Sequence, residues 1–174
     1  TQNCTNYIHL VAKFDETKTT SLGTTSGDTT HFDIIDKWGN MVAATPSGGW
    51  LQSSPIIPEL GFCLSNRAQM FWLDKSSPAS LAPGKRPRTT LSPSLALKDG
   101  TPYMVFGTPG GDQQDQWSLH LFLRHIHFNL NLQESIDAPG FNTAHFPNSF
   151  YPRETDIGSL FVEARFPEKT IKKL

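Results

Sequence analysis

The sequence has few cysteines, no surplus of basic residues and no long apolar run. Cys4 and Cys63 are its only cysteines and form no CxxC pair, so neither a disulfide scaffold nor a thiolate zinc site is indicated. The formal net charge of -1, with no Lys and Arg cluster interleaved with aromatics, argues against a nucleic-acid partner. No apolar run approaches the roughly 20 residues of a membrane helix, so we expect no membrane span.

The composition is that of an ordinary globular domain. The chain has 174 residues, of which 37% are apolar and 18% charged, which is sufficient for one core. Residues 1–28 are polar and rich in Thr and Ser, and only Tyr7 to Val11 has strand character, so we expect a loose arm there. Beyond this arm the sequence alternates between strand-like segments and turns.

Two β-hairpins are predicted, one on each side of a long irregular segment. The first spans residues 29–46 and turns at KWGN, and the second spans residues 89–108 and turns at Asp99-Gly100. Between them, residues 47–86 carry several Pro and Gly and suggest one short turn near Ala68 to Phe71.

The C-terminal part of the sequence predicts helices and one strand. We expect a largely buried helix over 113–130 with Asp112 as its N-cap, since no Pro or Gly interrupts it. A short helix at 132–137, a strand at 159–165 and a helical turn from Pro167 follow. Three histidines in this part, His120, His125 and His127, do not share one helix face, so no metal site is expected.

Thr29 is the candidate nucleophile. A threonine hydroxyl needs a base to remove its proton, and the α-amine of the same residue, with a pKa near ~7.7 to 8.0, would serve. That amine exists only if the bond between Asp28 and Thr29 is cut. Gly27 and Asp28 give the bend that such a cleavage requires. Taken alone, however, GDTTH is also typical of an ordinary strand that begins with threonine.

Ser47 is the expected hydroxyl partner of Thr29. A turn centred on Trp38 and Gly39 places Ser47 opposite Thr30 and beside Thr29, where it would orient the nucleophile or its amine. A shift of the pairing by one residue would turn Ser47 to the other face. A small residue at the end of a strand is the alternative interpretation of the same position.

The segment GTPGGD before the long helix indicates an oxyanion hole. Consecutive glycines let a substrate approach the backbone, and amides at a helix start point outward, so Gly110 and Gly111 would stabilise the tetrahedral oxyanion of amide hydrolysis. Glycine-rich turns of this kind also bind phosphate. The Walker lysine and the GxGxxG pattern are absent, and we expect no cofactor.

These motifs together resemble the gamma-glutamyltranspeptidases, a family of N-terminal-nucleophile hydrolases. The matching segments are TTH with FDIIDKWGN, GKRPRTTLSPS with its KDG turn, and FGTPGG before a helix, and they run from about Gly27 to Phe166. A bacterial branch of that family is closer still, since it shares PSGGW, RAQMFWLD and GTPGGDQQDQW.

The resemblance implies an α+β fold, a sandwich of two sheets between helices, of which this chain holds the small-subunit part. Residues 1–28 would end the large subunit, and residues 29–174 would form the catalytic small-subunit region, truncated at its C-terminus. Precursor cleavage between Asp28 and Thr29 would separate the two subunits, which stay partners.

The resemblance also implies the roles of the site residues. Thr29 would be the nucleophile, Ser47 would assist it, and Gly110 and Gly111 would be the oxyanion donors. The substrate, a small amide, would be held by a second group of residues: Thr45, Gly49, Arg67, Thr89 and Thr90.

Three positions depart from the family pattern, and they leave three functions open. An asparagine of the family is Gly49 here, and the glutamine and aspartate that hold the substrate's amino group are Arg67 and Met70. A thioether cannot replace a charge-assisted bond to an ammonium, and Arg67 would favour an anionic group. The chain is therefore expected to be a gamma-glutamyltransferase-like amide hydrolase, an acylase for glutaryl or other acyl amides, or an inactive homologue that serves binding or assembly.

Overall fold

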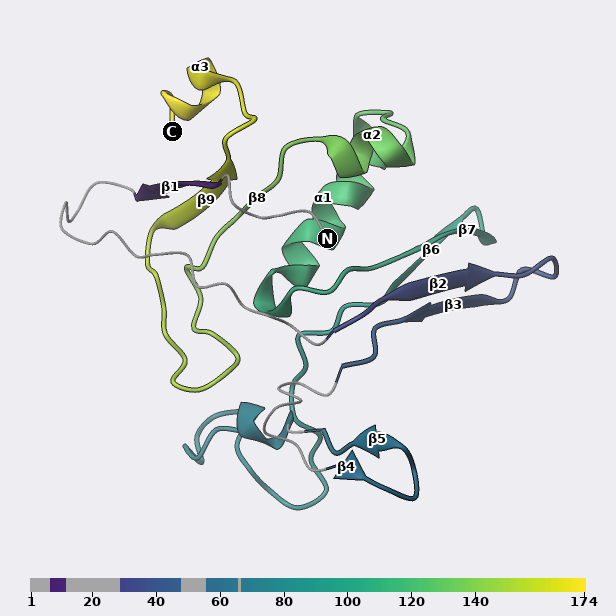
Figure 1. The fold of residues 1–174 in the computed structure, drawn as a ribbon, viewed down its shortest axis with the longest axis vertical. Helices are drawn as coiled ribbons and strands as arrows, with labels where there is room; N and C mark the ends of the chain where they lie inside the picture. The colour runs from purple at the N-terminus through teal and green to yellow at the C-terminus, as the bar shows by residue number, and fades with distance from the viewer. Residues whose placement is uncertain (1–6, 12–28, 48–55, 66) are drawn as a thin grey trace. The chain divides into compact units, whose positions relative to one another are not determined.

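The computed structural model describes residues 7–11, 29–47, 56–65 and 67–174. These residues form two compact units rather than the single core expected from the length. The site unit contains strands β2 to β7, the start of helix α1 and residues Ser149–Pro152. The C-terminal unit contains β1, the rest of α1, α2, β8, β9 and α3 (Figure 1).

The first predicted hairpin is present in the site unit. Strand β2 (Phe32–Ile35) pairs antiparallel with β3 (Met41–Ala44), and Phe32 lies opposite Ala44. The Asp36 carboxylate closes the turn, because it accepts the backbone N–H groups of Trp38 and Asn40 at 2.9 Å. Gly39 has a φ of 85°, a left-handed conformation that favours glycine.

The pairing of this hairpin differs by one residue from the predicted one. Thr30 N–H donates to the Pro46 carbonyl at 3.2 Å, which continues the β2–β3 register toward Thr29. Ser47 therefore lies opposite Thr29, and the prediction that it lies opposite Thr30 is wrong. The loop explains the difference, since three residues that end in a left-handed Gly39 connect Asp36 to Asn40 in place of a two-residue turn.

The second predicted hairpin is also present. Strand β6 (Ser94–Lys98) pairs with β7 (Thr101–Phe106) across the two-residue turn Asp99-Gly100, whose φ angles are 51° and 77°. Two positive φ angles define the type I′ turn that the Asp-Gly pair predicts. The first strand begins at Ser94, later than the predicted position 89. The two hairpins lie side by side (Figure 1).

The irregular segment contains one expected and one unexpected element. The short turn predicted near Ala68 is a 3-10 helix, η2 (Arg67–Met70). A small hairpin of β4 (Ile56–Ile57) and β5 (Phe62–Cys63) precedes it and was not predicted. Only η2 carries residues of the expected site.

The long predicted helix begins after the glycine turn. A 3-10 turn, η3 (Gly111–Gln113), leads into α1 (Gln114–His127). The prediction that Asp112 caps the helix is wrong, because Asp112 lies within η3 and its carboxylate accepts the Ser149 N–H at 2.8 Å. The expectation of a largely buried helix is not met either, since Gln114 and Ser118 are the buried residues among its described positions.

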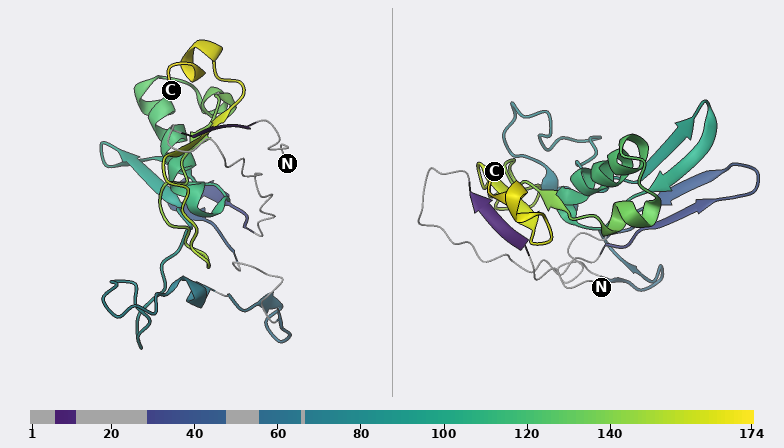
Figure 2. Two further views of the ribbon diagram at one scale, coloured as in Figure 1. Left: turned by 90° about the vertical axis from the view of Figure 1, so that its left-hand side faces the viewer. Right: turned by 90° about the horizontal axis from the view of Figure 1, so that it is seen from above.

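The C-terminal unit is built on a three-stranded sheet of order β1-β9-β8. Strand β1 (Tyr7–Val11) runs antiparallel to β9 (Ser159–Glu163), which also pairs with β8 (Phe141–Asn142). The strand-like part of the expected loose arm is thus a sheet strand, drawn in purple beside β9 in Figure 2. Helices α2 (Leu132–Asp137) and α3 (Glu168–Ile171) confirm two further predictions, and Asn131 caps α2 through a capping box.

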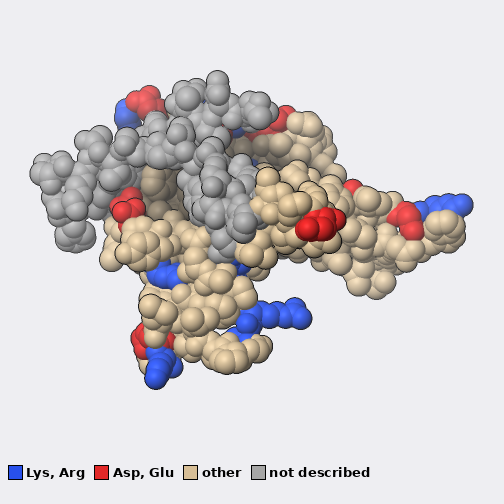
Figure 3. Space-filling model, turned by 60° about the horizontal axis from the view of Figure 1, so that its bottom comes forward, with Lys and Arg blue, Asp and Glu red and all other residues tan. Residues whose placement is uncertain are grey.

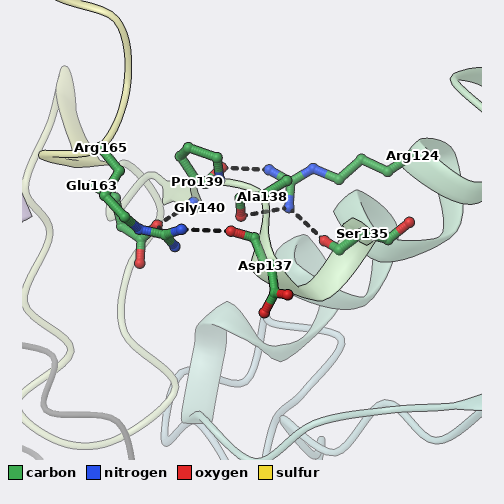
Figure 4. A network of polar contacts seen from close by, with 8 residues as sticks. All are labelled: Arg124, Ser135, Asp137, Ala138, Pro139, Gly140, Glu163 and Arg165. Atoms are coloured by element: carbon green, nitrogen blue, oxygen red, sulfur yellow. Dashed lines mark hydrogen bonds and ion pairs between the residues drawn. The ribbon is translucent and has the colours of Figure 1, made fainter. Parts of the chain in front are cut away.

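Arginine side chains tie this unit together (Figure 4). Arg124 of α1 donates to the carbonyl of Ser135 in the last turn of α2 and to those of Ala138 and Pro139 just beyond it. Arg165 donates to the carbonyl of Asp137. Because the last carbonyls of a helix have no intrahelical partner, these guanidinium groups satisfy the C-terminus of α2.

Few large apolar side chains are buried in the described residues. The buried ones are Met70, Met104 and Val162. Phe32, Ile34 and Val42 of the first hairpin are 48%, 54% and 46% exposed. On the face drawn in Figure 3, most of the described surface belongs to residues other than Lys, Arg, Asp and Glu. No helix among the described residues is long and apolar enough to span a membrane.

Candidate active site

The candidate nucleophile and its expected partner face each other. Thr29 Oγ1 donates a hydrogen bond of 2.9 Å to Ser47 Oγ, and both residues are half-buried. The register brings them together, since they are cross-strand neighbours just beyond the ends of β2 and β3. The predicted pairing of these two hydroxyls is therefore present, although through a different register.

A histidine lies on the same face of the hairpin, two residues further along the strand than Thr29. His31 Nδ1 is 2.8 Å from Thr45 Oγ1, and its Nε2 is 2.8 Å from an Asp33 carboxylate oxygen. The imidazole packs directly on Gly107, where a Cβ would come within 2.3 Å of the ring. Thr45, expected to bind substrate, thus uses its hydroxyl for His31. The alternation of residues 29, 31 and 33 along the strand was the signal that could have predicted this contact.

Arg67 joins Ser47, just beyond the end of β3, to the segment that precedes β6. Its Nη2 donates to Ser47 Oγ at 3.0 Å and its Nη1 to Thr90 Oγ1 at 3.1 Å. Met70, fully buried one turn further on, has its sulfur 3.9 Å from the same Nη1. Thr90 is buried, whereas Thr89 is exposed and its hydroxyl accepts the Leu91 N–H at 3.0 Å. Of Thr89 and Thr90, both predicted to hold the substrate, Thr90 is the one in contact with Arg67.

The two glycines before α1 have backbone conformations that glycine alone adopts easily. Gly110 and Gly111 have φ angles of 141° and 62°. A Cβ on Gly110 would also lie 2.2 Å from the Trp117 ring. The tight turn that the predicted oxyanion hole requires is therefore built into this segment.

Gln114 ties this glycine turn to its surroundings, and sequence analysis did not anticipate it. It is fully buried, and in the amide orientation that satisfies its neighbours its nitrogen donates to the carbonyls of Thr90 and Thr108 at 3.2 and 2.9 Å. Its oxygen accepts the Gly111 N–H at 3.2 Å. The amides of Gly110 and Gly111 are therefore not equivalent, because that of Gly111 already has an acceptor.

Five of the predicted site residues are thus joined by hydrogen bonds within one unit, with Gln114 as a link between them. The chain of contacts runs through Thr29, Ser47, Arg67, Thr90, Gln114 and Gly111. Asp28 and Gly49 lie outside the described residues. The contacts bring together hydroxyls, a guanidinium and a glycine turn. A hydroxyl nucleophile and backbone amides at a turn are groups that acyl-transfer enzymes use.

Two of the histidines considered as metal ligands, His120 and His125, contact neighbouring residues of the C-terminal unit. His120 lies against the Phe141 ring at 4.1 Å, and burial, with a smaller contribution from Arg124, lowers the pKa of His120 below its usual 6.5. His125 Nδ1 is 2.8 Å from the Leu130 carbonyl. In the part of the chain that the structure describes, no three His, Cys, Asp or Glu side chains form a group that could hold a metal ion.

Known proteins share this sequence pattern. The model of the family described as Gamma-glutamyltranspeptidase matches residues 5–174. The glutathione hydrolase proenzyme of a Pseudomonas species is 33% identical over 133 residues, which cover 70% of this chain and 23% of that protein. The oxamate amidohydrolase proenzyme of Klebsiella pneumoniae is 40% identical over 115 residues, which cover 65% of this chain and 22% of that protein.

A solved structure is similar to most of this chain. The structure of LmbA2991HD is 58% identical in sequence and superposes with a TM-score of 0.75 over 83% of this chain and 26% of that one. The chain spans less than a quarter of the length of the two curated relatives. Since the family model matches nearly all of the sequence, the chain belongs to the gamma-glutamyltranspeptidase family.

Proposed function

We propose that this chain is the small-subunit part of an amide hydrolase related to gamma-glutamyltransferase, with Thr29 as its nucleophile. The hydrogen bond of 2.9 Å between Thr29 and Ser47 is the observation that carries the proposal. It sets the hydroxyl of the predicted nucleophile beside a second hydroxyl that orients it. Cleavage of the bond between Asp28 and Thr29 supplies the α-amine that acts as base.

The reaction proceeds through an ester of Thr29. The α-amine takes the hydroxyl proton, Oγ1 attacks the amide carbonyl carbon, and a tetrahedral oxyanion forms. The carbon–nitrogen bond then breaks, and the leaving amine receives the proton. Water attacks the ester in the second step, which releases the acid and returns the proton to Oγ1. An amine in place of water would give transfer rather than hydrolysis.

The glycine turn supports the oxyanion step. The Gly110 N–H is the principal donor in this proposal, and the Gly111 N–H contributes a bond that it shares with Gln114. Loss of one such donor typically costs on the order of 3 kcal/mol of transition-state stabilisation. Gln114 fixes the turn, because it holds Gly111 and the Thr108 carbonyl at the same time.

The residues around Arg67 favour an acyl group that carries a carboxylate. Arg67 and the nucleophile both contact Ser47 Oγ, so the guanidinium lies no further from Thr29 Oγ1 than two consecutive hydrogen bonds. A guanidinium binds carboxylates through parallel hydrogen bonds. Met70 offers no charge for the ammonium of a gamma-glutamyl group. The relative named oxamate amidohydrolase supports this preference, since oxamate has a carboxylate beside its amide.

A large subunit from the same precursor completes the enzyme in this proposal. Both curated relatives are named as proenzymes, and this chain covers about a quarter of each. The exposed apolar side chains of the first hairpin, Phe32, Ile34 and Val42, are the surface that such a subunit would cover. The complete molecule would then form the sandwich of two sheets between helices.

An assay of the full-length precursor tests the proposal. The substrates are gamma-glutamyl, glutaryl and simple acyl amides together with oxamate, and release of amine or ammonia is measured. We expect turnover of the carboxylate-bearing amides, lost in Thr29→Ala and retained in Thr30→Ala, since the Thr30 side chain is exposed. Turnover that survives in Thr29→Ala would contradict the proposal. Absence of turnover together with an intact precursor would favour the inactive homologue.

A further inference from the structure

Arg67 is held by hydrogen bonds to two hydroxyls, and an aromatic ring lies against its guanidinium as well. The hydroxyls of Ser47 and Thr90 accept hydrogen bonds from its two terminal nitrogens. The Phe150 ring lies across the guanidinium, whose carbon is 5.6 Å from the ring centroid. That distance is within the range of about 6 Å over which a guanidinium is attracted to an aromatic face. The guanidinium that is proposed to select the acyl group is therefore covered on one face by an aromatic ring from a segment distant in sequence.

The position of Phe150 is fixed through Asp112. Ser149, which precedes Phe150, is fully buried and donates both its backbone N–H, at 2.8 Å, and its hydroxyl to the Asp112 carboxylate. Asp112 directly follows Gly110 and Gly111. One carboxylate thus anchors the Phe150 segment to the glycine turn, and all of these residues belong to the site unit.

We propose that Phe150 is a specificity-determining residue, which holds Arg67 in the position that selects carboxylate-bearing acyl groups, and that Asp112 is its positioning residue. The inference rests on the proposed function. An aromatic ring over one face of the guanidinium excludes water there. A planar carboxylate would approach along the nitrogen-bearing edge, where it would share donors with Ser47 and Thr90. It also removes rotamers that a long, flexible arginine would otherwise populate.

A matched pair of substrates isolates this effect. Glutaryl-4-nitroanilide and valeryl-4-nitroanilide have acyl chains of equal carbon number and differ in the terminal carboxylate. In the full-length precursor, Phe150→Leu is expected to lower kcat/KM for the glutaryl substrate about fivefold to tenfold through KM, with little change for the valeryl substrate. Asp112→Asn shifts the same ratio in the same direction and by less, because an amide still accepts the Ser149 N–H.

Two controls accompany these variants. Phe146→Leu removes a ring that is 77% exposed, and Asp115→Asn neutralises an exposed carboxylate one helical turn from Asp112. Both are expected to leave the glutaryl-to-valeryl ratio unchanged. A Phe150→Leu variant that lowers turnover of both substrates equally, or of neither, would overturn the inference.

A binding measurement separates this inference from the proposed function. Calorimetry with glutarate on the Thr29→Ala precursor reports the Arg67 site without any chemistry. We expect Phe150→Leu to weaken glutarate binding severalfold and Phe146→Leu to leave it unchanged. If the wild-type precursor turns over neither substrate, the proposed function fails while this affinity difference still supports the role of Phe150. Equal glutarate affinity in the two phenylalanine variants would refute that role.

Discussion

The two faces of the β2–β3 hairpin differ in chemistry although they alternate along the same two strands. The polar face carries the hydrogen-bonded pairs Thr29–Ser47 and His31–Thr45. The apolar face carries Phe32, Ile34 and Val42, which are about half exposed. Because successive side chains of a strand point to opposite faces, a change of one residue in the pairing would exchange them. The position of the nucleophile therefore depends on the register of this hairpin.

The largest effect is expected from breaking the polar face at Ser47. Ser47→Ala removes the oxygen that accepts both Thr29 and Arg67. We expect kcat of the full-length enzyme to fall about 100-fold, as for loss of a group that assists proton transfer. Ser47→Thr keeps the hydroxyl and should restore most of the activity. Equal activity of the alanine and threonine variants would show that this hydroxyl has no role.

The second prediction concerns the contact between His31 of the polar face and Gly107, which follows β7. In Gly107→Ala the new methyl group would lie 2.3 Å from the His31 ring, so His31 must move and its contact with Thr45 is lost. We expect a loss of about 2 kcal/mol in the free energy of unfolding, measured by urea denaturation. Gly140→Ala is the matched control, since nothing lies within 4 Å of a Cβ there. Equal losses in the two variants would contradict the packing described for His31.

A charge on the apolar face tests whether that face is covered in the complete protein. Ile34→Glu is expected to destabilise the full-length precursor by about 2 kcal/mol or more, because a subunit interface would bury the new charge. The reversal Lys37→Glu, in the exposed turn of the same hairpin, should have little effect. If thermal denaturation gives the same stability for both variants, the face is open to solvent in the precursor.

The smallest effect concerns the turn that sets the register. A hydrogen bond from the Asn40 side chain, together with backbone N–H groups, lowers the pKa of Asp36 below its usual 3.8. Since the folded-state pKa is depressed, the stabilisation is present above pH 3.8 and is lost as the pH falls through the folded value. Asp36→Asn should remove this part of the acid dependence of unfolding. An unchanged pH profile in the variant would rule out the contribution.

Local sequence signals predicted the elements whose causes are local. The Asp99-Gly100 turn and α2 fall where the sequence places them, because turn and capping chemistry act within a few residues. The register of the first hairpin was mispredicted, since KWGN is compatible with a loop of two or three residues.

The site was predictable in its composition and not in its contacts. Thr29, Ser47 and Arg67 were singled out in advance and lie together. The contacts of Gln114 and of Phe150 join segments far apart in sequence, and no local pattern encodes them. The role of Asp112 was mispredicted for the same reason. Its carboxylate accepts the N–H of Ser149, which is distant in sequence, and does not cap the start of the helix.

The amino-terminal residue of the mature protein tests the central claim most directly. Intact-mass and fragment mass spectrometry of the purified full-length product would locate any cleavage. We expect two chains, of which the smaller begins at Thr29, and a single uncut chain in Thr29→Ala. A wild-type protein that stays uncut between Asp28 and Thr29 under conditions where it hydrolyses an amide would contradict the account, because its nucleophile would then have no α-amine.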